Sequence, residues 1–170
     1  MLSHSEERVE RIGEKEGNMT LRVEDVMVKE VIKINENMTI KEAADLMCKY
    51  DIGCLITVKK GKVSGILTER DVLKKVVAES KDASKLRVRD VMTSPLIVAE
   101  TKMDLGEAVR LMFQRKIKKL PVVEGKCVVG LVSLTDIVRF QPQMMGLIKL
   151  LVANPTTPKS MQKIVDHYIV

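Results

Sequence analysis

The residues best suited to chemistry lie in two short motifs of one pattern, a glycine followed by a hydroxyl residue and, three positions later, an aspartate. The motifs span residues 65–71 and 130–136. A hydroxyl residue with a carboxylate three positions later is typical of a helix N-terminal cap. The same geometry suits a phosphate or a ribose, because the first N–H groups of a helix are unpaired and its dipole is positive there. Both interpretations stay open for the candidate side chains Thr68, Asp71, Ser133 and Asp136.

A second candidate is the cationic stretch Arg115–Lys119, in which four cations flank Ile117. It is either a solvated basic turn or the rim of an anion site. The stretch 65 residues earlier, 50–54, reads Tyr-Asp-Ile-Gly-Cys and has no cation. An anion site built with residues 115–119 should therefore be stronger than one built with residues 50–54.

No motif in the sequence supports catalysis or a metal site. The three cysteines, Cys48, Cys54 and Cys127, form no CxxC pair and fit reduced thiols in a cytosol. Cys54 and Cys127 fall in expected strands, where small thiols are commonly buried. His4 and His167 lie near opposite ends of the chain, so a Cys/His zinc site is not expected. With no Walker loop, GxGxxG or GxSxG, we expect neither an enzyme nor a catalytic cofactor.

The composition fits a folded protein with an anionic partner. Of 170 residues, 45% are apolar and 31% charged, and the formal net charge is +6. Aromatic residues make up only 2%, which disfavours a stacking platform for single-stranded nucleic acid. Apolar runs are too short to cross a bilayer, and the charged N-terminus lacks a signal core, so a cytoplasmic protein is expected.

An internal duplication organises the chain. Val23–Met27 recurs as Val88–Met92, and the same 65-residue offset aligns residues 23–71 with 88–136 without a gap. Sixteen of these 49 aligned positions are identical. We therefore expect repeats at 21–80 and 86–140, between a charged N-terminal extension at 1–20 and a C-terminal helical tail at 141–170.

Hydrophobic patterning predicts the order β-α-β-β-α in each repeat. A short polar link, Glu79–Leu86, should join the repeats, and Thr39–Glu42 is a capping box that begins a helix. The tail should contain a helix at 144–153, a turn at 154–158 and a final helix at 160–170, and residues 3–16 are a frayed helix at most. The expected strands are 31–34, 54–58 and 62–67 in the first repeat and 96–98, 120–123 and 127–132 in the second.

Together these features resemble a tandem pair of cystathionine-β-synthase (CBS) domains over residues 23–140. The resemblance rests on the Asp-Val-Met openings at 25–27 and 90–92, the Leu-Pro-Val-Val stretch at 120–123 and the two motif endings. It implies an α/β (α+β) fold in which two β-α-β-β-α repeats pack sheet to sheet as an intertwined pair, with extra N- and C-terminal segments. Two clefts should lie between the sheets.

The resemblance also implies that these clefts bind an adenosine-type ligand, namely AMP, ADP, ATP or a relative of S-adenosylmethionine. The first strands would supply apolar walls for adenine, around Val31–Lys33 with Ile32 and around Pro95–Ile97. Since positions 53 and 54 carry no cation, nucleotides should prefer the first cleft. Carried over, cleft one joins Gly65, Ile66, Thr68, Arg70 and Asp71 to Lys118 and Lys119, and cleft two joins Leu131, Ser133, Thr135 and Asp136 to Gly53 and Cys54.

These expectations favour a stand-alone regulatory sensor that binds an adenine nucleotide and signals through altered packing or dimer geometry. A homodimer is expected from the resemblance, and an unidentified protein target would read the signal. Two alternatives stay open, a basic nucleic-acid-binding protein and a structural dimerisation module with unoccupied clefts. Nucleic acid is disfavoured as a partner, and no membrane partner is expected.

Overall fold

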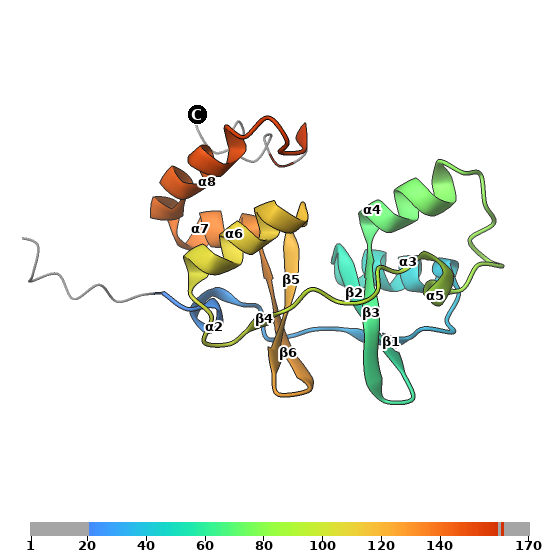
Figure 1. Ribbon diagram of the computed structural model, residues 1–170. Helices are drawn as coiled ribbons and strands as arrows, with labels where there is room; N and C mark the ends of the chain where they lie inside the picture. Colours follow the sequence, from blue (N-terminus) through green and yellow to red (C-terminus); the bar gives the residue numbers. More distant parts are fainter. Residues whose placement is uncertain (1–20, 160, 162–170) are drawn as a thin grey trace, which may run out of the picture.

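The computed structural model describes residues 21–159 and 161, which form two α/β units lying side by side (Figure 1). Unit one is built on the sheet β1-β2-β3 and unit two on the sheet β4-β5-β6. In each sheet the first strand is parallel to the middle strand, and the other two form an antiparallel hairpin. The predicted α/β fold class is confirmed. The strands are β1 (Lys33–Asn35), β2 (Cys54–Lys59), β3 (Lys62–Thr68), β4 (Ala99–Glu100), β5 (Lys119–Glu124) and β6 (Cys127–Ser133).

The longest helix of each unit positions the strand that follows it. Helix α3 (Ile40–Tyr50) begins with the predicted capping box, in which the Thr39 side chain accepts from the Glu42 N–H. Its counterpart α6 (Leu105–Arg115) ends at Lys116, whose φ of 57° is left-handed and turns the chain into β5. The cationic stretch is therefore a helix-to-strand corner, fixed at both ends by regular structure.

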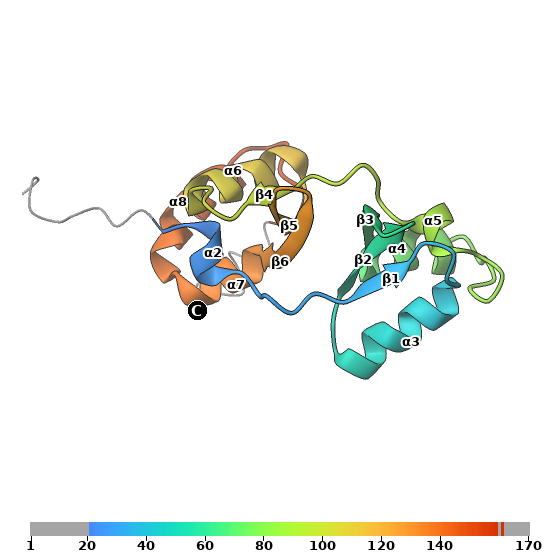
Figure 2. The ribbon, with the colours of Figure 1, turned by 90° about the horizontal axis from the view of Figure 1, so that it is seen from below.

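The opening helices of the two repeats are exchanged between the units. Val23 and Val26 of α2 (Val23–Val26) are buried in the core of unit two, and the Val23 N–H donates to the Met103 carbonyl. Helix α5 (Val88–Val91) belongs instead to the core of unit one. The two units are therefore intertwined, as the family resemblance implies. Figure 2 shows the two extended connections that pass between them.

The exchange moves the crossing points away from the predicted link at 79–86. The carbonyls of Leu86 and Ala83 in that link accept from N–H groups of α3, so it stays within unit one. The chain instead crosses between residues 28 and 32 and again between residues 93 and 99. The polar stretch 79–86 resembles a linker in the sequence, but its residues Ala83 and Leu86 pack against the core of unit one. The repeat boundaries themselves stay a prediction.

The second crossing also explains why the predicted strand 96–98 is wrong. The paired strand β4 covers only Ala99–Glu100. Leu96 packs between the two sheets, and Leu96 and Ile97 line a cavity. The apolar character of 96–98 therefore reflects burial of an extended connection rather than strand pairing.

The two sheets meet through a small apolar cluster. Buried residues from β2, β3 and β6 form it, and Leu96 and Leu131 pack against it. This contact is the predicted sheet-to-sheet packing. Cys127 is exposed, contrary to expectation, because it begins β6 beside the hairpin turn. The buried members of the cluster are Cys54, Ile56, Ile66 and Val128.

Each hairpin leads into a second, capped helix. Helix α4 (Glu69–Val72) continues as the π-helical segment η1 (Leu73–Val77), and its counterpart in unit two is α7 (Leu134–Phe140). Beyond the repeats, the 3₁₀ turn η2 (Pro142–Met144) leads into α8 (Met145–Val152), which lies against α6. Ile148 of α8 is buried in the core of unit two.

The predicted tail helix at 144–153 is confirmed, with its bounds shortened by one residue at each end. The expected helices at 3–16 and 160–170 lie outside the described residues, apart from Met161, as do His4 and His167. Within the described part of the chain, no helix is both long and apolar enough to cross a membrane.

Candidate functional site

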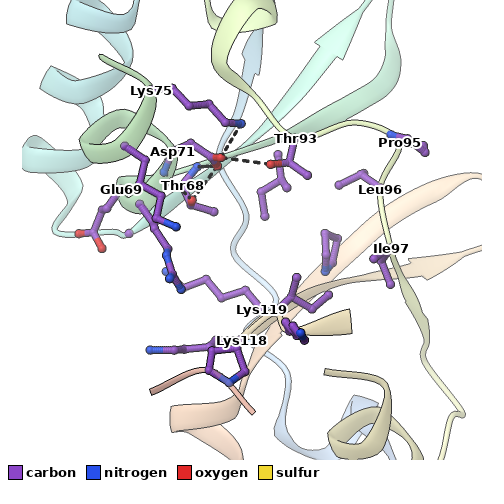
Figure 3. Close-up of a pocket in the computed structure, with 18 residues that line it drawn as sticks. Thr68, Glu69, Asp71, Lys75, Thr93, Pro95, Leu96, Ile97, Lys118 and Lys119 are labelled. Carbon is purple, nitrogen blue, oxygen red and sulfur yellow. Dashed lines mark hydrogen bonds and ion pairs between the residues drawn. The ribbon is translucent and has the colours of Figure 1, made fainter. Parts of the chain in front are cut away.

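A cavity of 690 Å³ opens between the two units, and both units contribute to its walls (Figure 3). This volume lies in the range of small-molecule sites, about 300–1,000 Å³. The end of β3 and the start of α4 supply one side, and the corner between α6 and β5 supplies the opposite side. The structure thereby brings together six of the seven residues predicted for cleft one: Ile66, Thr68, Arg70, Asp71, Lys118 and Lys119.

The carboxylate of Asp71 lies at the centre of a hydrogen-bond network on the unit-one wall. The N–H and hydroxyl of Thr68 both donate to its Oδ2, at 3.0 and 2.7 Å. On its Oδ1, Lys75 Nζ forms an ion pair at 2.8 Å and Thr93 Oγ1 donates at 3.2 Å. The predicted cap is therefore present, and its carboxylate also faces the cavity.

This network keeps Asp71 ionised. Burial is the largest influence and favours the neutral acid, yet the hydrogen bonds from Lys75 and Thr68 and the charge of Lys75 outweigh it, so the pKa of Asp71 is lowered. Lys75 Nζ also donates to the Val91 carbonyl of α5 at 2.7 Å. Through Lys75 the exchanged helix is therefore joined to the carboxylate in the cavity.

The unit-two wall carries a concentration of positive charge. Burial, and then the charges of Arg70 and Lys119, lower the pKa of Lys118. Over residues 21–159 and 161, the ammonium groups of Lys118 and Lys119 form no ion pair and donate no hydrogen bond. Two neighbouring ammonium groups of this kind in one cavity favour an anion as its ligand.

An apolar wall completes the cavity beside the cations. Pro95, Leu96 and Ile97, from the second crossing, lie along it (Figure 3). The stretch Pro95–Ile97 was predicted as an apolar wall, and it lines the cavity from an extended connection rather than from a strand. Thr93 carries no sequence signal as a site residue. Lys75 could have been found, because it lies four positions after Asp71 on the same helical face.

Gly65 does not line the cavity, although it was predicted in cleft one. Its backbone lies beneath the first residues of the crossing chain, where the Ile66 and Thr93 N–H groups and carbonyls are paired. A Cβ at position 65 would lie 2.7 Å from the Thr93 carbonyl oxygen. Glycine is therefore needed here for a close backbone approach, which places the cavity wall rather than contacting a ligand.

The residues predicted for cleft two form only part of a comparable site. Ser133 caps α7 and donates to Asp136 Oδ2 at 2.5 Å, which repeats the cap of unit one. Burial raises the pKa of the Cys54 thiol, and the charge of Lys119 opposes this effect. Gly53 instead lines the first cavity. Half-buried Thr135 and Leu131 lie on unit two, and Ile32 packs against the core of unit one, outside the 690 Å³ cavity.

The two symmetry-related sites differ sharply in charge. By the 65-residue offset, Gly53 and Cys54 correspond to Lys118 and Lys119, and Phe140 corresponds to Lys75. Arg70 and Lys116 likewise correspond to Thr135 and Asp51, so five of the six cations that line the first cavity have no cationic counterpart. The preference of nucleotides for the first cleft and the ligand roles of all these residues stay predictions.

Comparison with known proteins identifies the repeats. The CBS domain family matches residues 23–78 and 88–142. The chain belongs to the CBS domain family, as a tandem pair. A CBS domain-containing protein of Bacillus subtilis, YhcV, is 36% identical over 115 residues, which cover 68% of this chain and 81% of that protein. The predicted family is therefore confirmed.

Two solved CBS structures are informative neighbours. The CBS pair of protein MJ0100, in complex with 5-methylthioadenosine and S-adenosyl-L-methionine, is 30% identical with a TM-score of 0.66, and the match covers 73% of this chain and 98% of that one. The hexameric CBS-CP12 protein from bloom-forming cyanobacteria is 28% identical with a TM-score of 0.70, covering 80% and 83%. CBS pairs of this kind therefore include binders of adenosyl compounds and self-assembling proteins.

Similarity to enzymes is confined to a small part of those enzymes. Inosine-5'-monophosphate dehydrogenase of Thermoplasma acidophilum is 34% identical over 132 residues, but this match covers only 26% of that enzyme. Its activity therefore does not extend to this chain on similarity grounds. Among the described residues, no group of three or more His, Cys, Asp or Glu side chains is placed to hold a metal ion.

Proposed function

We propose that the chain is a regulatory CBS pair that binds an adenine nucleotide in the cavity between its units. The observation that carries this proposal is the pairing of an apolar wall, Leu96 and Ile97, with the unpaired ammonium groups of Lys118 and Lys119 in one cavity of 690 Å³. An apolar wall suits a purine ring, and the lysines suit a phosphate. The adenosyl ligands of the MJ0100 pair support the adenosine part of this proposal.

The charge distribution favours a phosphorylated ligand in this cavity. Asp71 already accepts four hydrogen bonds, so a ribose hydroxyl can bind it only by replacing a present donor. Thr93, at 3.2 Å, is the weakest of these donors. The site predicted for cleft two, where five of the six cations of the first cavity have no cationic counterpart, would take a neutral adenosyl compound in preference to a nucleotide.

Regulation follows from the position of the cavity between the units. A ligand that touches Asp71 on unit one and Lys118 on unit two bridges the two sheets. It can shift their packing only if it binds one arrangement more tightly than another. An unidentified protein target would then recognise the favoured arrangement.

Calorimetric titration with AMP, ADP, ATP, S-adenosylmethionine and adenosine tests this function. We expect AMP to bind more tightly than adenosine, and we expect its occupancy at 100 times Kd to stabilise the fold by about 2.7 kcal/mol in thermal unfolding. If none of these compounds binds, the clefts are structural only. Steeply salt-dependent binding to a generic DNA duplex, without nucleotide binding, would favour the nucleic-acid alternative.

We also propose that a second copy of the chain covers the exposed helical face of unit one. Leu73 and Val77 of η1 are 61% and 62% exposed, four positions apart on one face. The residue equivalent to Leu73 in unit two is Val138, which is only 4% exposed because its core is closed by α8. Helix α8 therefore covers this face in unit two, whereas in unit one the face at Leu73 and Val77 is exposed. The self-assembly of the hexameric relative supports a second copy of the chain as the partner of this face.

Replacing Leu73 by aspartate should separate this dimer. We expect sedimentation velocity to show a dimer for the wild type and an increase of at least about tenfold in the dimer dissociation constant for Leu73→Asp, because a charge would be desolvated in the interface. Leu150→Asp is the matched control, since Leu150 lies on the outer face of α8 and is 76% exposed. A monomeric wild type, or dissociation by Leu150→Asp alone, would contradict the proposed face.

A further inference from the structure

The chain that follows α8 returns to the cavity between the units. Pro158, which lies outside both repeats, lines the cavity beside Lys116, Ile117 and Lys118. Figure 1 shows this red segment extending from α8 towards the side of unit two that faces α4. The cavity therefore has a wall that neither repeat supplies.

The position of Pro158 is fixed from both sides. After it, Met161 is 1% exposed within the core of unit two, and the Met161 N–H donates to the Pro158 carbonyl at 2.8 Å. Before it, the Thr157 hydroxyl donates to the Leu151 carbonyl at the end of α8, at 3.0 Å. Residues 153–159 and 161, here called the return segment, are thus anchored to α8 and to the core of unit two.

We propose that the return segment is part of the ligand site and that its docking is coupled to nucleotide binding. This inference rests on the proposed function. Proline has no N–H, so Pro158 offers an apolar surface beside the lysines. Such a surface keeps water away from the ammonium groups, and a lower local dielectric strengthens their attraction for a phosphate.

The coupling is reciprocal by thermodynamic necessity. If the docked return segment tightens nucleotide binding by some factor, a bound nucleotide favours the docked segment by the same factor. Occupancy of the cavity would then be transmitted through Pro158 and Met161 to α8, which covers the core of unit two. The C-terminal segment is therefore the element by which this chain reports its ligand.

Calorimetric titration of the full chain with AMP tests this coupling. We expect Pro158→Gly and Met161→Ala each to raise the Kd for AMP about fivefold or more, and Leu150→Ala, on the outer face of the same helix, to leave it within about twofold. In the wild type, AMP should also slow hydrogen exchange at the Thr157 and Met161 amides, whose N–H groups donate to carbonyls of the same segment.

The outcomes separate this inference from the proposed function. If the wild type binds AMP but both variants bind it equally well and exchange at Thr157 and Met161 is unchanged, the coupling is overturned and the proposed function stands. If the wild type binds no AMP, both are overturned. Should Met161→Ala unfold unit two, Pro158→Gly decides, because Pro158 is only half-buried.

Discussion

Replacing Lys118 and Lys119 together by alanine is expected to raise the Kd for AMP at least about a hundredfold. Each lost hydrogen bond between an ammonium group and a phosphate costs about 1.5–3 kcal/mol, and 1.4 kcal/mol is a factor of ten in Kd. The two side chains have no ion-pair partner within 21–159 and 161, so removing them breaks no salt bridge. Isothermal titration calorimetry would measure the change.

A control with the same change in net charge makes this result specific. Lys62→Ala with Lys126→Ala removes two exposed lysines at the hairpin turns, and neither lines the cavity. We expect this variant to bind AMP within about threefold of the wild type, because exposed charges at a distance are screened by salt. An equal loss of affinity in the two variants would mean that overall charge, rather than the cavity, holds the nucleotide.

The second large effect is expected for Asp71→Asn. An amide cannot accept from Lys75 and from both donors of Thr68 at once, because its nitrogen is itself a donor. The Asp71 side chain is only 11% exposed, so the lost hydrogen bonds are not replaced by water. We therefore expect a loss of about 1–3 kcal/mol in the free energy of unfolding at pH 7. AMP binding should weaken as well. Urea unfolding and calorimetry would measure the two effects.

The effect of Asp71→Asn on stability should depend on pH with a definite sign. The pKa of Asp71 is lowered in the folded protein, below the ordinary value of 3.8. Its contribution to stability is therefore fully present above pH 3.8 and is lost as the pH falls through the lower, folded value. The difference between wild type and variant should stay constant at neutral pH and shrink in acid.

Asp136→Asn provides the matched control for Asp71. Asp136 likewise accepts from the hydroxyl of its cap residue, Ser133, but unit one adds a bond from the Thr68 N–H to Asp71, and Phe140 stands where unit one has Lys75. We expect a smaller loss of stability and no change in AMP affinity at the lysine-rich cavity. If only Asp136→Asn weakened AMP binding, the nucleotide would occupy the other cleft.

Much of the fold could be predicted because it depends on local pattern. The caps at Thr39, Thr68 and Ser133 and the hairpin strands follow from short motifs, and the duplication shows that they are not accidental. The exchange of α2 and α5 could not be predicted from composition or periodicity. A short apolar helix such as Val23–Val26 fits either core equally well, and only three-dimensional packing decides which one it completes.

The same distinction separates the predicted from the unpredicted site residues. Thr68, Asp71 and the two lysines carry chemistry in the sequence itself. Pro95–Ile97 were predicted as an apolar wall, but within a strand that does not form. Thr93 follows the exchanged helix, and Pro158 lies in a segment without a repeat to compare it with. Their roles depend on where two connections pass, which is a property of topology. Gly53 was predicted for cleft two and lines the first cavity instead.

The exchanged opening helices have a consequence for any attempt to divide the protein. If the chain were cut between residues 79 and 86, the N-terminal fragment would keep α2, which packs in the core of unit two. It would lose α5, which packs in the core of unit one. Each half would therefore lack one helix of its own core, expose the apolar residues that this helix covers, and carry a helix that packs only in the other unit. The two halves depend on being synthesised as one polypeptide, and they should lose their structure in a single cooperative step.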